Sequence, residues 1–100
     1  MMIVHVDFDV DPAERTHALA VLEMEVGEVR ALPGCRHFAP YADPALPGRV
    51  SIVHEWEDEA ALATYLASTA FARSGEALRP IMTGPPSSRR FRAEMIEEVA

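Results

Sequence analysis

The stretch that decides the fold is Arg49-Val-Ser-Ile-Val-His-Glu-Trp56, which is followed at once by Glu57-Asp-Glu-Ala-Ala-Leu-Ala-Thr-Tyr65. It indicates a strand that ends in a large aromatic residue and turns directly into a helix. Side chains alternate along a strand, so one face carries an apolar row with a single histidine: Val50, Ile52, His54 and Trp56. This face is compatible with two interpretations, a plain hydrophobic core or the floor of a small-molecule pocket.

Three further strands are predicted around this unit. Alternating apolar and polar residues mark a half-buried strand from Met2 to Val10. A weaker strand runs from Cys35 to Tyr41, and we place it at the edge of the sheet because Pro40 cannot donate to a neighbouring strand. The fourth strand is expected from Phe91 to Ile96, after the break at Thr83-Gly-Pro-Pro86.

Two helices connect these strands. The first begins at Asp11-Pro-Ala-Glu14, a typical capping sequence, and ends at Pro33-Gly34. Its buried stripe is expected to contain Leu19, Leu22, Val26 and Val29. Its solvated face is expected to contain Glu23, Glu25 and Glu28. Asp58 or a neighbour caps the second helix, which we expect to loosen between Ser68 and Gly75 because glycine disfavours a helix interior.

The resulting order, β-α-β-β-α-β, is that of a ferredoxin-like α+β fold in a single domain over residues 1–100. Right-handed crossovers place both helices on one face of a four-stranded antiparallel sheet. The other face is left open, with a mixed set of side chains: Ile3, His5, Asp7, Asp9, Ser51, Val53 and Glu55. We predict that this open face packs against the same face of a second copy to form a homodimer.

The composition narrows the range of partners. The chain has a net charge of −7, and its nine basic residues are all arginines. Such an acidic balance argues against nucleic acid or an anionic membrane as the main partner. The only basic cluster, Arg89, Arg90 and Arg92, is interpreted as a solvated strand edge or as intersubunit ion pairs. The single Cys35 excludes an internal disulfide, and no apolar stretch approaches the ~20 residues of a membrane span, so a cytoplasmic location is expected.

Several features together resemble one family. They are the Pro-Gly after the first helix, Glu55-Trp56 at the end of the third strand, Ser68-x-x-Phe71, and Leu78-x-Pro80 before a Gly-Pro turn. With the β-α-β-β-α-β order, this pattern resembles the antibiotic biosynthesis monooxygenase superfamily of dimeric α/β barrels. The resemblance implies a small dimer with a pocket between sheet and helices in each subunit. Some members oxidise anthrones or quinols with dioxygen and no metal, flavin or haem; others degrade haem.

The chain also departs from the active relatives. Many quinol-oxidising relatives carry a histidine early in the second helix, where this chain has Tyr65. Anthrone-oxidising relatives use a strand Trp with an Asn, a Tyr and an Arg. The resemblance assigns Trp56 to the Trp and Arg73 to the Arg, but Ile52 and Leu62 stand at the Asn and Tyr positions. Haem-degrading relatives need a histidine late in the second helix, which is absent here, so haem chemistry is not expected.

The sequence therefore predicts a cofactor-free monooxygenase for a small phenol, quinol or anthrone, or alternatively a non-catalytic binding protein of the same fold. His54 would be the base, because an ordinary histidine pKa near 6.5 suits removal of a phenolic proton. Trp56 would be a wall that stacks on the ligand, with Tyr65 and Arg73 as polar anchors. Each residue also has a purely structural interpretation. His54 and Trp56 would then be core residues, Tyr65 a residue at the boundary of the core, and Arg73 an exposed cation near a helix end.

The remaining predicted pocket residues are apolar apart from one histidine. Ile52, Leu62 and Phe71 are expected to bind substrate together with His37, whose direction the alternation of its strand leaves open. A metal site would need three or four converging ligands. No recognised ligand spacing is present, so no metal is predicted.

Overall fold

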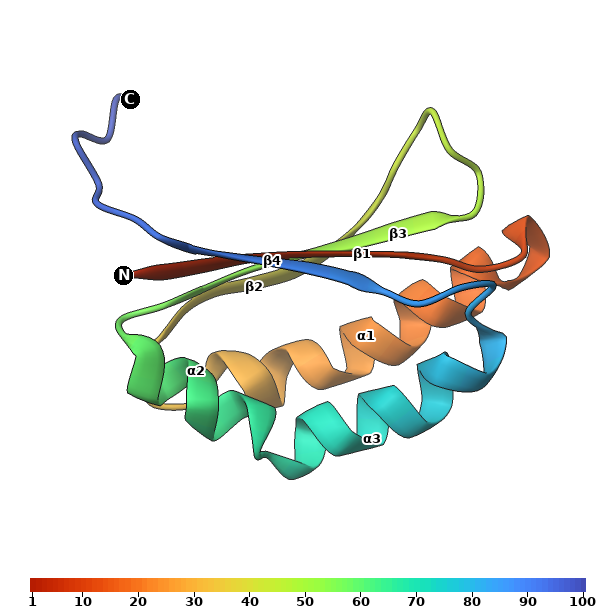
Figure 1. The fold of residues 1–100 in the computed structure, drawn as a ribbon, viewed down its shortest axis with the longest axis horizontal. Coiled ribbons are helices and arrows are strands. Elements are labelled where there is room, and N and C mark those ends of the chain that lie inside the picture. Colours follow the sequence, from red (N-terminus) through yellow and green to blue (C-terminus); the bar gives the residue numbers. More distant parts are fainter.

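The computed structural model describes residues 1–100 and contains a four-stranded antiparallel sheet with all its helices on one face (Figure 1). The strands are β1 (Met2–Asp9), β2 (Cys35–Ala42), β3 (Arg49–Trp56) and β4 (Ser87–Arg92). The helices are α1 (Arg15–Arg30), α2 (Glu59–Leu66) and α3 (Thr69–Leu78), with short 3-10 turns at Pro12–Glu14 and Arg79–Ile81. The predicted α+β ferredoxin-like fold is confirmed. No helix is both long and apolar enough to cross a membrane.

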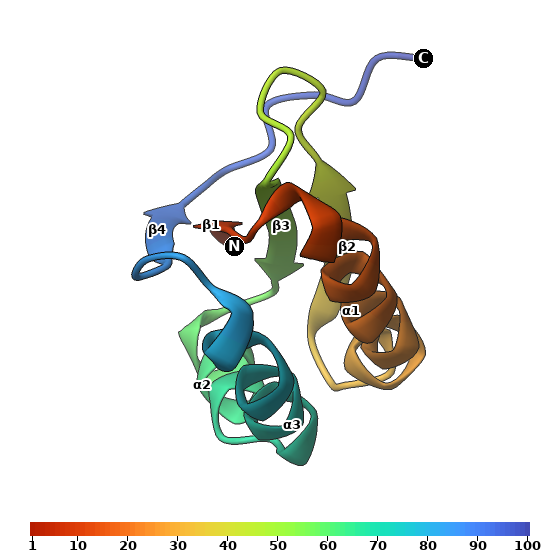
Figure 2. The ribbon, with the colours of Figure 1, turned by 90° about the vertical axis from the view of Figure 1, so that its right-hand side faces the viewer.

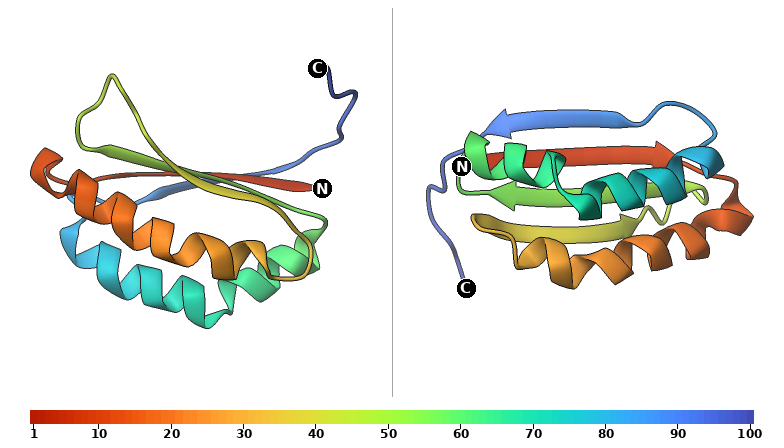
Figure 3. Two further views of the ribbon diagram at one scale, coloured as in Figure 1. Left: turned by 180° about the vertical axis from the view of Figure 1, so that it is seen from behind. Right: turned by 90° about the horizontal axis from the view of Figure 1, so that it is seen from below.

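The strands lie in the order β2-β3-β1-β4, so β2 is an edge strand as Pro40 predicted. Figure 2 shows the sheet end-on, with α1 below β2 and β3, and α2 and α3 below the β1–β4 side. Figure 3 shows the same arrangement from the helical side, where α1 and the α2–α3 pair run roughly along the strands. The opposite face of the sheet carries no helix.

Strand β3 has the two distinct faces that its sequence predicts. Val50, Ile52, His54 and Trp56 are all buried, and they alternate with half-buried residues. His54 pairs across the sheet with Val4 of β1 and Phe38 of β2, so these three residues lie on the helix-covered face. The hydrophobic core therefore sits between this face and the helices.

The fourth strand differs from its predicted range. It covers Ser87–Arg92 instead of residues 91–96, so the prediction was wrong at both ends. The register explains the limit, because Arg92 pairs with Met2 and β1 begins at that residue. Beyond this point Ala93 still bonds to Met1: its N–H donates to the Met1 carbonyl, and its carbonyl accepts from the Met1 amino group, each at 2.8 Å. The remaining residues have no strand to pair with, and Figure 1 shows them leaving the sheet on the side away from the helices.

The second helical region consists of two helices rather than one loosened helix. Asp58 caps α2 as predicted, because its Oδ1 accepts from the N–H of Ala61 at 2.9 Å. Helix α2 ends at Leu66, and the Oγ of Ser68 accepts from the N–H of Phe71 at 3.2 Å to begin α3. The Ser68-x-x-Phe71 pattern is thus a helix cap. The predicted loosening up to Gly75 was wrong, because Gly75 lies within α3.

Gly34 makes the tight turn between α1 and β2. Its φ is +80°, in the left-handed region that the Pro-Gly pattern predicted. A Cβ at this position would lie 2.6 Å from the Cβ of Ala61 in α2. The turn therefore requires glycine for two reasons, namely its positive φ angle and the close approach of α2.

Candidate active site

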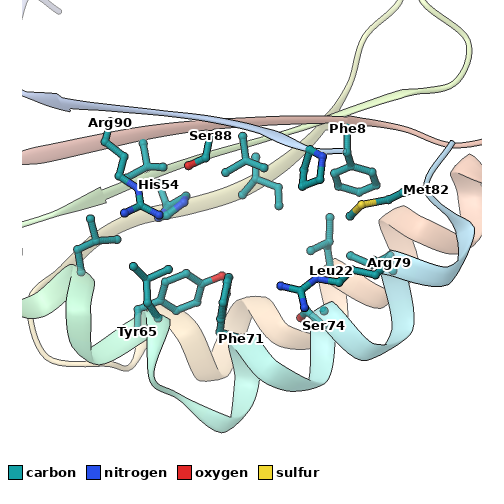
Figure 4. Close-up of a pocket in the computed structure, with 18 residues that line it drawn as sticks. Phe8, Leu22, His54, Tyr65, Phe71, Ser74, Arg79, Met82, Ser88 and Arg90 are labelled. Carbon is teal, nitrogen blue, oxygen red and sulfur yellow. The ribbon is translucent and has the colours of Figure 1, made fainter. Parts of the chain in front are cut away.

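A cavity of about 160 Å³ lies between the helix-covered face of the sheet and the α2–α3 layer (Figure 4). It is lined on the sheet side by β1, β3 and β4, and on the other side mainly by α2 and α3, with the 3-10 turn at one end. Most of its lining is apolar. The lining residues are Val4, Val6, Phe8, Leu22, Ile52, His54, Leu62, Tyr65, Leu66, Phe71, Ser74, Gly75, Leu78, Arg79, Met82, Pro86, Ser88 and Arg90.

His54 is held in this lining by Trp56. The indole Nε1–H of Trp56 donates to Nδ1 of His54 at 2.7 Å, and both side chains are buried. The bond forms because the two residues are neighbours on one face of β3. Since Nδ1 accepts, the neutral imidazole carries its proton on Nε2. No buried side-chain nitrogen or oxygen is left without a partner, and Nε2 has none in the protein, so Nε2–H opens onto the cavity.

Burial lowers the pKa of His54 to about 4, and the positive charge of Arg90 acts in the same direction. The ring is therefore neutral at pH 7. Because Nε2 already carries the proton, the ring could take up a second proton only at Nδ1, which would break the Trp56 hydrogen bond and leave a buried positive charge. Geometry and electrostatics together make His54 a hydrogen-bond donor to the cavity and a poor base.

Trp56 does not line the cavity. It is fully buried, and its ring stacks on Tyr65 with centroids 5.1 Å apart and planes 22° apart. Tyr65 in turn meets Phe38, His54 and Phe71 in edge contacts with centroids 5.3–5.7 Å apart. The aromatic cluster fixes the position of the His54 ring, and the surface available for stacking on a ligand belongs to Tyr65 and Phe71.

Tyr65 lines the cavity as predicted and is almost fully buried. Burial raises the pKa of its phenol, so the hydroxyl keeps its proton at any physiological pH. The hydroxyl has no hydrogen-bond partner in the protein, yet no buried polar atom is unsatisfied, so it too is accessible from the cavity. Ile52, Leu62 and Phe71 also line the cavity, as predicted.

Arg73 lies outside the cavity, in an ion pair on the far side of α3. Its Nε and Nη2 donate to the two carboxylate oxygens of Glu25 at 2.7 Å, and Nη2 also meets Glu28 at 2.6 Å. The prediction that Glu25 is solvated was wrong, because it is 7% exposed. The Arg73 hydrogen bonds lower the pKa of Glu25. This bidentate pair joins α3 to α1.

His37 projects from the open face of the sheet, away from the cavity. It pairs in register with Glu55, on the face opposite His54, and its Nε2 lies 3.4 Å from the hydroxyl of Tyr41. The register therefore settles the direction that the sequence left open. No group of three or more His, Cys, Asp or Glu residues is gathered in a way that could hold a metal ion.

Four polar residues that sequence reasoning missed line the cavity: Ser74, Arg79, Ser88 and Arg90. Arg90 belonged to the cluster interpreted as a solvated strand edge. That interpretation suits Arg89, which pairs with Asp7, and the exposed Arg92, which pairs with Glu59 at the start of α2. Arg90 is also exposed on this edge strand, but the β1–β4 register places it opposite Val4 on the helix-covered face, where it lines the cavity. Correct bounds for β4 would have indicated that Arg90 faces the cavity.

The fold and the site define a two-layer α+β domain with a largely apolar cavity between its sheet and its helices. The family model described as antibiotic biosynthesis monooxygenase matches residues 1–77. The chain belongs to this family, as the sequence resemblance indicated. No individually curated protein has a sequence that matches the chain.

Solved structures support the same fold at low sequence identity. A candidate antibiotic biosynthesis monooxygenase from Deinococcus radiodurans is 21% identical, with a TM-score of 0.89, and the match covers 100% of this chain and 99% of that one. Rv0793 from Mycobacterium tuberculosis is 19% identical, with a TM-score of 0.85 and coverage of 99% and 98%. NE2512 from Nitrosomonas europaea, of unknown function, is 14% identical, with a TM-score of 0.83 and coverage of 99% and 94%.

Proposed function

We propose that this protein oxidises a small electron-rich phenol with dioxygen, without a cofactor, in the cavity between the sheet and α2–α3. The observation that carries the proposal is the Nε2–H of His54, which faces an apolar cavity from a ring held by Trp56. A fixed donor in an apolar site stabilises the oxygen of a phenolate more strongly than water does. The family to which the chain belongs supports the choice of oxygen chemistry.

The proposed reaction begins with ionisation of the bound phenol, whose proton leaves to water because no carboxylate lines the cavity. The phenolate passes one electron to dioxygen, which gives an aryloxyl radical and superoxide. The two combine at the ring carbon opposite the oxygen, forming a carbon–oxygen bond. The peroxide takes up a proton from water, and loss of that carbon's proton with cleavage of the O–O bond then yields a quinone and hydroxide, which the released proton converts to water. One phenol and one dioxygen are consumed for each quinone.

The residues of the cavity have distinct parts in this scheme. His54 donates from Nε2 to the phenolate oxygen, a role different from the base predicted from the sequence. The Tyr65 hydroxyl is a second neutral donor, and its ring with Phe71 forms the aromatic wall. An apolar cavity of about 150 Å³ holds benzene. The present volume, about 160 Å³, therefore favours one aromatic ring over the three rings of an anthrone.

The test is oxygen consumption with 2,6-dimethylphenol, followed together with quinone formation and corrected for the uncatalysed rate. We expect one quinone per dioxygen and no hydrogen peroxide from the wild type. Tyr65→Phe keeps the ring, and His54→Phe removes the cavity donor; both should lower kcat/KM by about tenfold or more. His17→Phe, on the exposed face of α1, is the matched control and should keep the wild-type rate.

A non-catalytic binding protein is the second candidate, and the absence of any base in the cavity favours it. In that case phenols would raise the melting temperature without consuming oxygen. A phenol that raises the melting temperature, while oxygen is consumed no faster with the protein than without it, would support this candidate and contradict the oxygenase.

We also propose that the open face of the sheet closes a homodimer in the cytoplasm. The face carries apolar and half-buried side chains beside polar ones, including Ile3, Val53 and the partly exposed Phe91. Pairing with the same face of a second copy would bury them. Sedimentation at micromolar concentration should give twice the chain mass of 11.0 kDa. A monomer under these conditions would contradict the proposal.

A further inference from the structure

The arginines of this acidic chain are nearly all partnered, and the exceptions gather at one place. Five of the nine bind a carboxylate or a backbone carbonyl of a residue that does not line the cavity. These five are Arg15, Arg30, Arg49, Arg73 and Arg89. Arg92 pairs with Glu59. Only Arg36, Arg79 and Arg90 have no carboxylate or carbonyl partner, and two of these three line the cavity. Arg79 and Arg90 are exposed to solvent at the edge of the cavity, so their guanidinium groups are free to meet an anionic ligand.

The two free guanidinium groups lie at different ends of the cavity. Figure 4 shows Arg90 beside His54 at one end and Arg79 beside Ser74 at the other. The Arg90 charge is close enough to His54 to lower its pKa. The Arg79 guanidinium lies over Gly75, where a Cβ would come within 3.7 Å of its Cζ.

Hydrogen-bond donors dominate both ends, and aromatic rings line the space between. One end offers Nε2–H of His54 and the Arg90 guanidinium; the other offers Arg79 with the Ser74 hydroxyl. No Asp or Glu lines the cavity. Such a site suits a ligand with an oxygen acceptor at each end and an apolar ring in the middle.

We infer that the substrate of this cavity is a one-ring aromatic acid, whose phenolic oxygen lies at His54 and Arg90 and whose carboxylate lies at Arg79. This inference rests on the proposed function for the identity of the reacting oxygen, but the binding it describes needs no turnover. Arg79 is then the residue that selects acids over neutral phenols, and Arg90 assists His54 at the phenolate.

Binding of two ligands of the same shape tests the inference. 4-Hydroxybenzoate carries the carboxylate, and 4-hydroxybenzamide replaces it with a neutral amide. We expect calorimetry to show the acid binding about tenfold more tightly than the amide, with the difference shrinking at high salt. Arg79→Gln should remove the difference, because binding of the acid weakens more than binding of the amide. Arg36→Gln, at an exposed position of β2 outside the cavity, should keep it.

The outcomes separate this inference from the proposed function. Equal affinity for acid and amide in the wild type, no binding of either, or an equal loss of both in Arg79→Gln would overturn the inference. Oxidation of 2,6-dimethylphenol with no preference for acids would overturn it while leaving the proposed function intact. A tenfold preference for the acid that Arg79→Gln abolishes, in a protein that consumes no oxygen, would support the inference and contradict the oxygenase.

Discussion

The two faces of strand β3 are built from the same eight residues and have opposite chemistry. The covered face carries His54 and Trp56, buried and bonded to each other, above a cavity without carboxylates. The open face carries Ser51, whose hydroxyl donates to Asp7 at 2.6 Å, and lies beside the Arg49–Asp9 ion pair. The acidic protein thus places carboxylates on its open face and leaves free cations at its cavity.

The largest expected effect, on the free energy of unfolding, comes from removing the hydrogen bond between Trp56 and His54 on the covered face. Trp56→Phe removes the indole N–H and leaves Nδ1 of His54 without a donor, in addition to opening space in the core. We expect a loss of about 2–4 kcal/mol in the free energy of unfolding, measured by urea denaturation. Val53→Ala on the open face of the same strand is the comparison and should cost less. Equal losses from the two variants would show that the Trp56 bond adds nothing.

The next effect is on the pH dependence of stability. The pKa of His54 is about 4 in the folded protein and near 6.5 when unfolded, so between these values the unfolded state binds more protons. Stability from this group is complete above pH 6.5 and falls as the pH drops toward 4. From pH 7 to pH 5 the loss should be about 2 kcal/mol. His54→Gln should abolish this slope, whereas His17→Gln at an exposed site should retain it; a slope unchanged in His54→Gln would contradict the buried neutral ring.

The smallest effect on activity is expected at Arg73. The structure places this residue in the Glu25 pair between α1 and α3, so Arg73→Gln should lower the melting temperature and leave kcat/KM for a phenol unchanged. Glu23→Gln, on the exposed face of α1, should change neither. The Glu25 contribution is present above the ordinary glutamate pKa and lost on acidification below it, because its folded pKa is lowered. A loss of kcat/KM at unchanged stability would return Arg73 to the catalytic role predicted from the sequence.

The sequence predicted the fold because its signals are local. Alternation in β3, the Asp58 cap and the glycine at position 34 each act within a few residues, and each is confirmed. The errors arose where the answer depends on a distant partner. The end of β4 is set by where β1 begins, and the burial of Glu25 is set by Arg73, 48 positions later.

The candidate site was predicted in part for the same reason. His54, Tyr65, Ile52, Leu62 and Phe71 line the cavity because their positions follow from strand and helix periodicity. The proton arrangement of His54 could not be read from the sequence, although its neighbour two positions away makes the bond. Arg90 was missed because the predicted fourth strand began after it, and Arg79 because its place at the cavity depends on how the turn after α3 packs against the rest of the chain.

The state of the His54 ring is the most direct test of this account. Nitrogen-15 NMR of the imidazole, assigned with His54→Gln, reports which nitrogen carries the proton and the pH at which the ring becomes charged. We predict a neutral ring with the proton on Nε2 at pH 7, which persists to about pH 4 in the wild type and loses its single form in Trp56→Phe. A ring protonated on Nδ1 at pH 7, or charged by pH 6, would contradict the account.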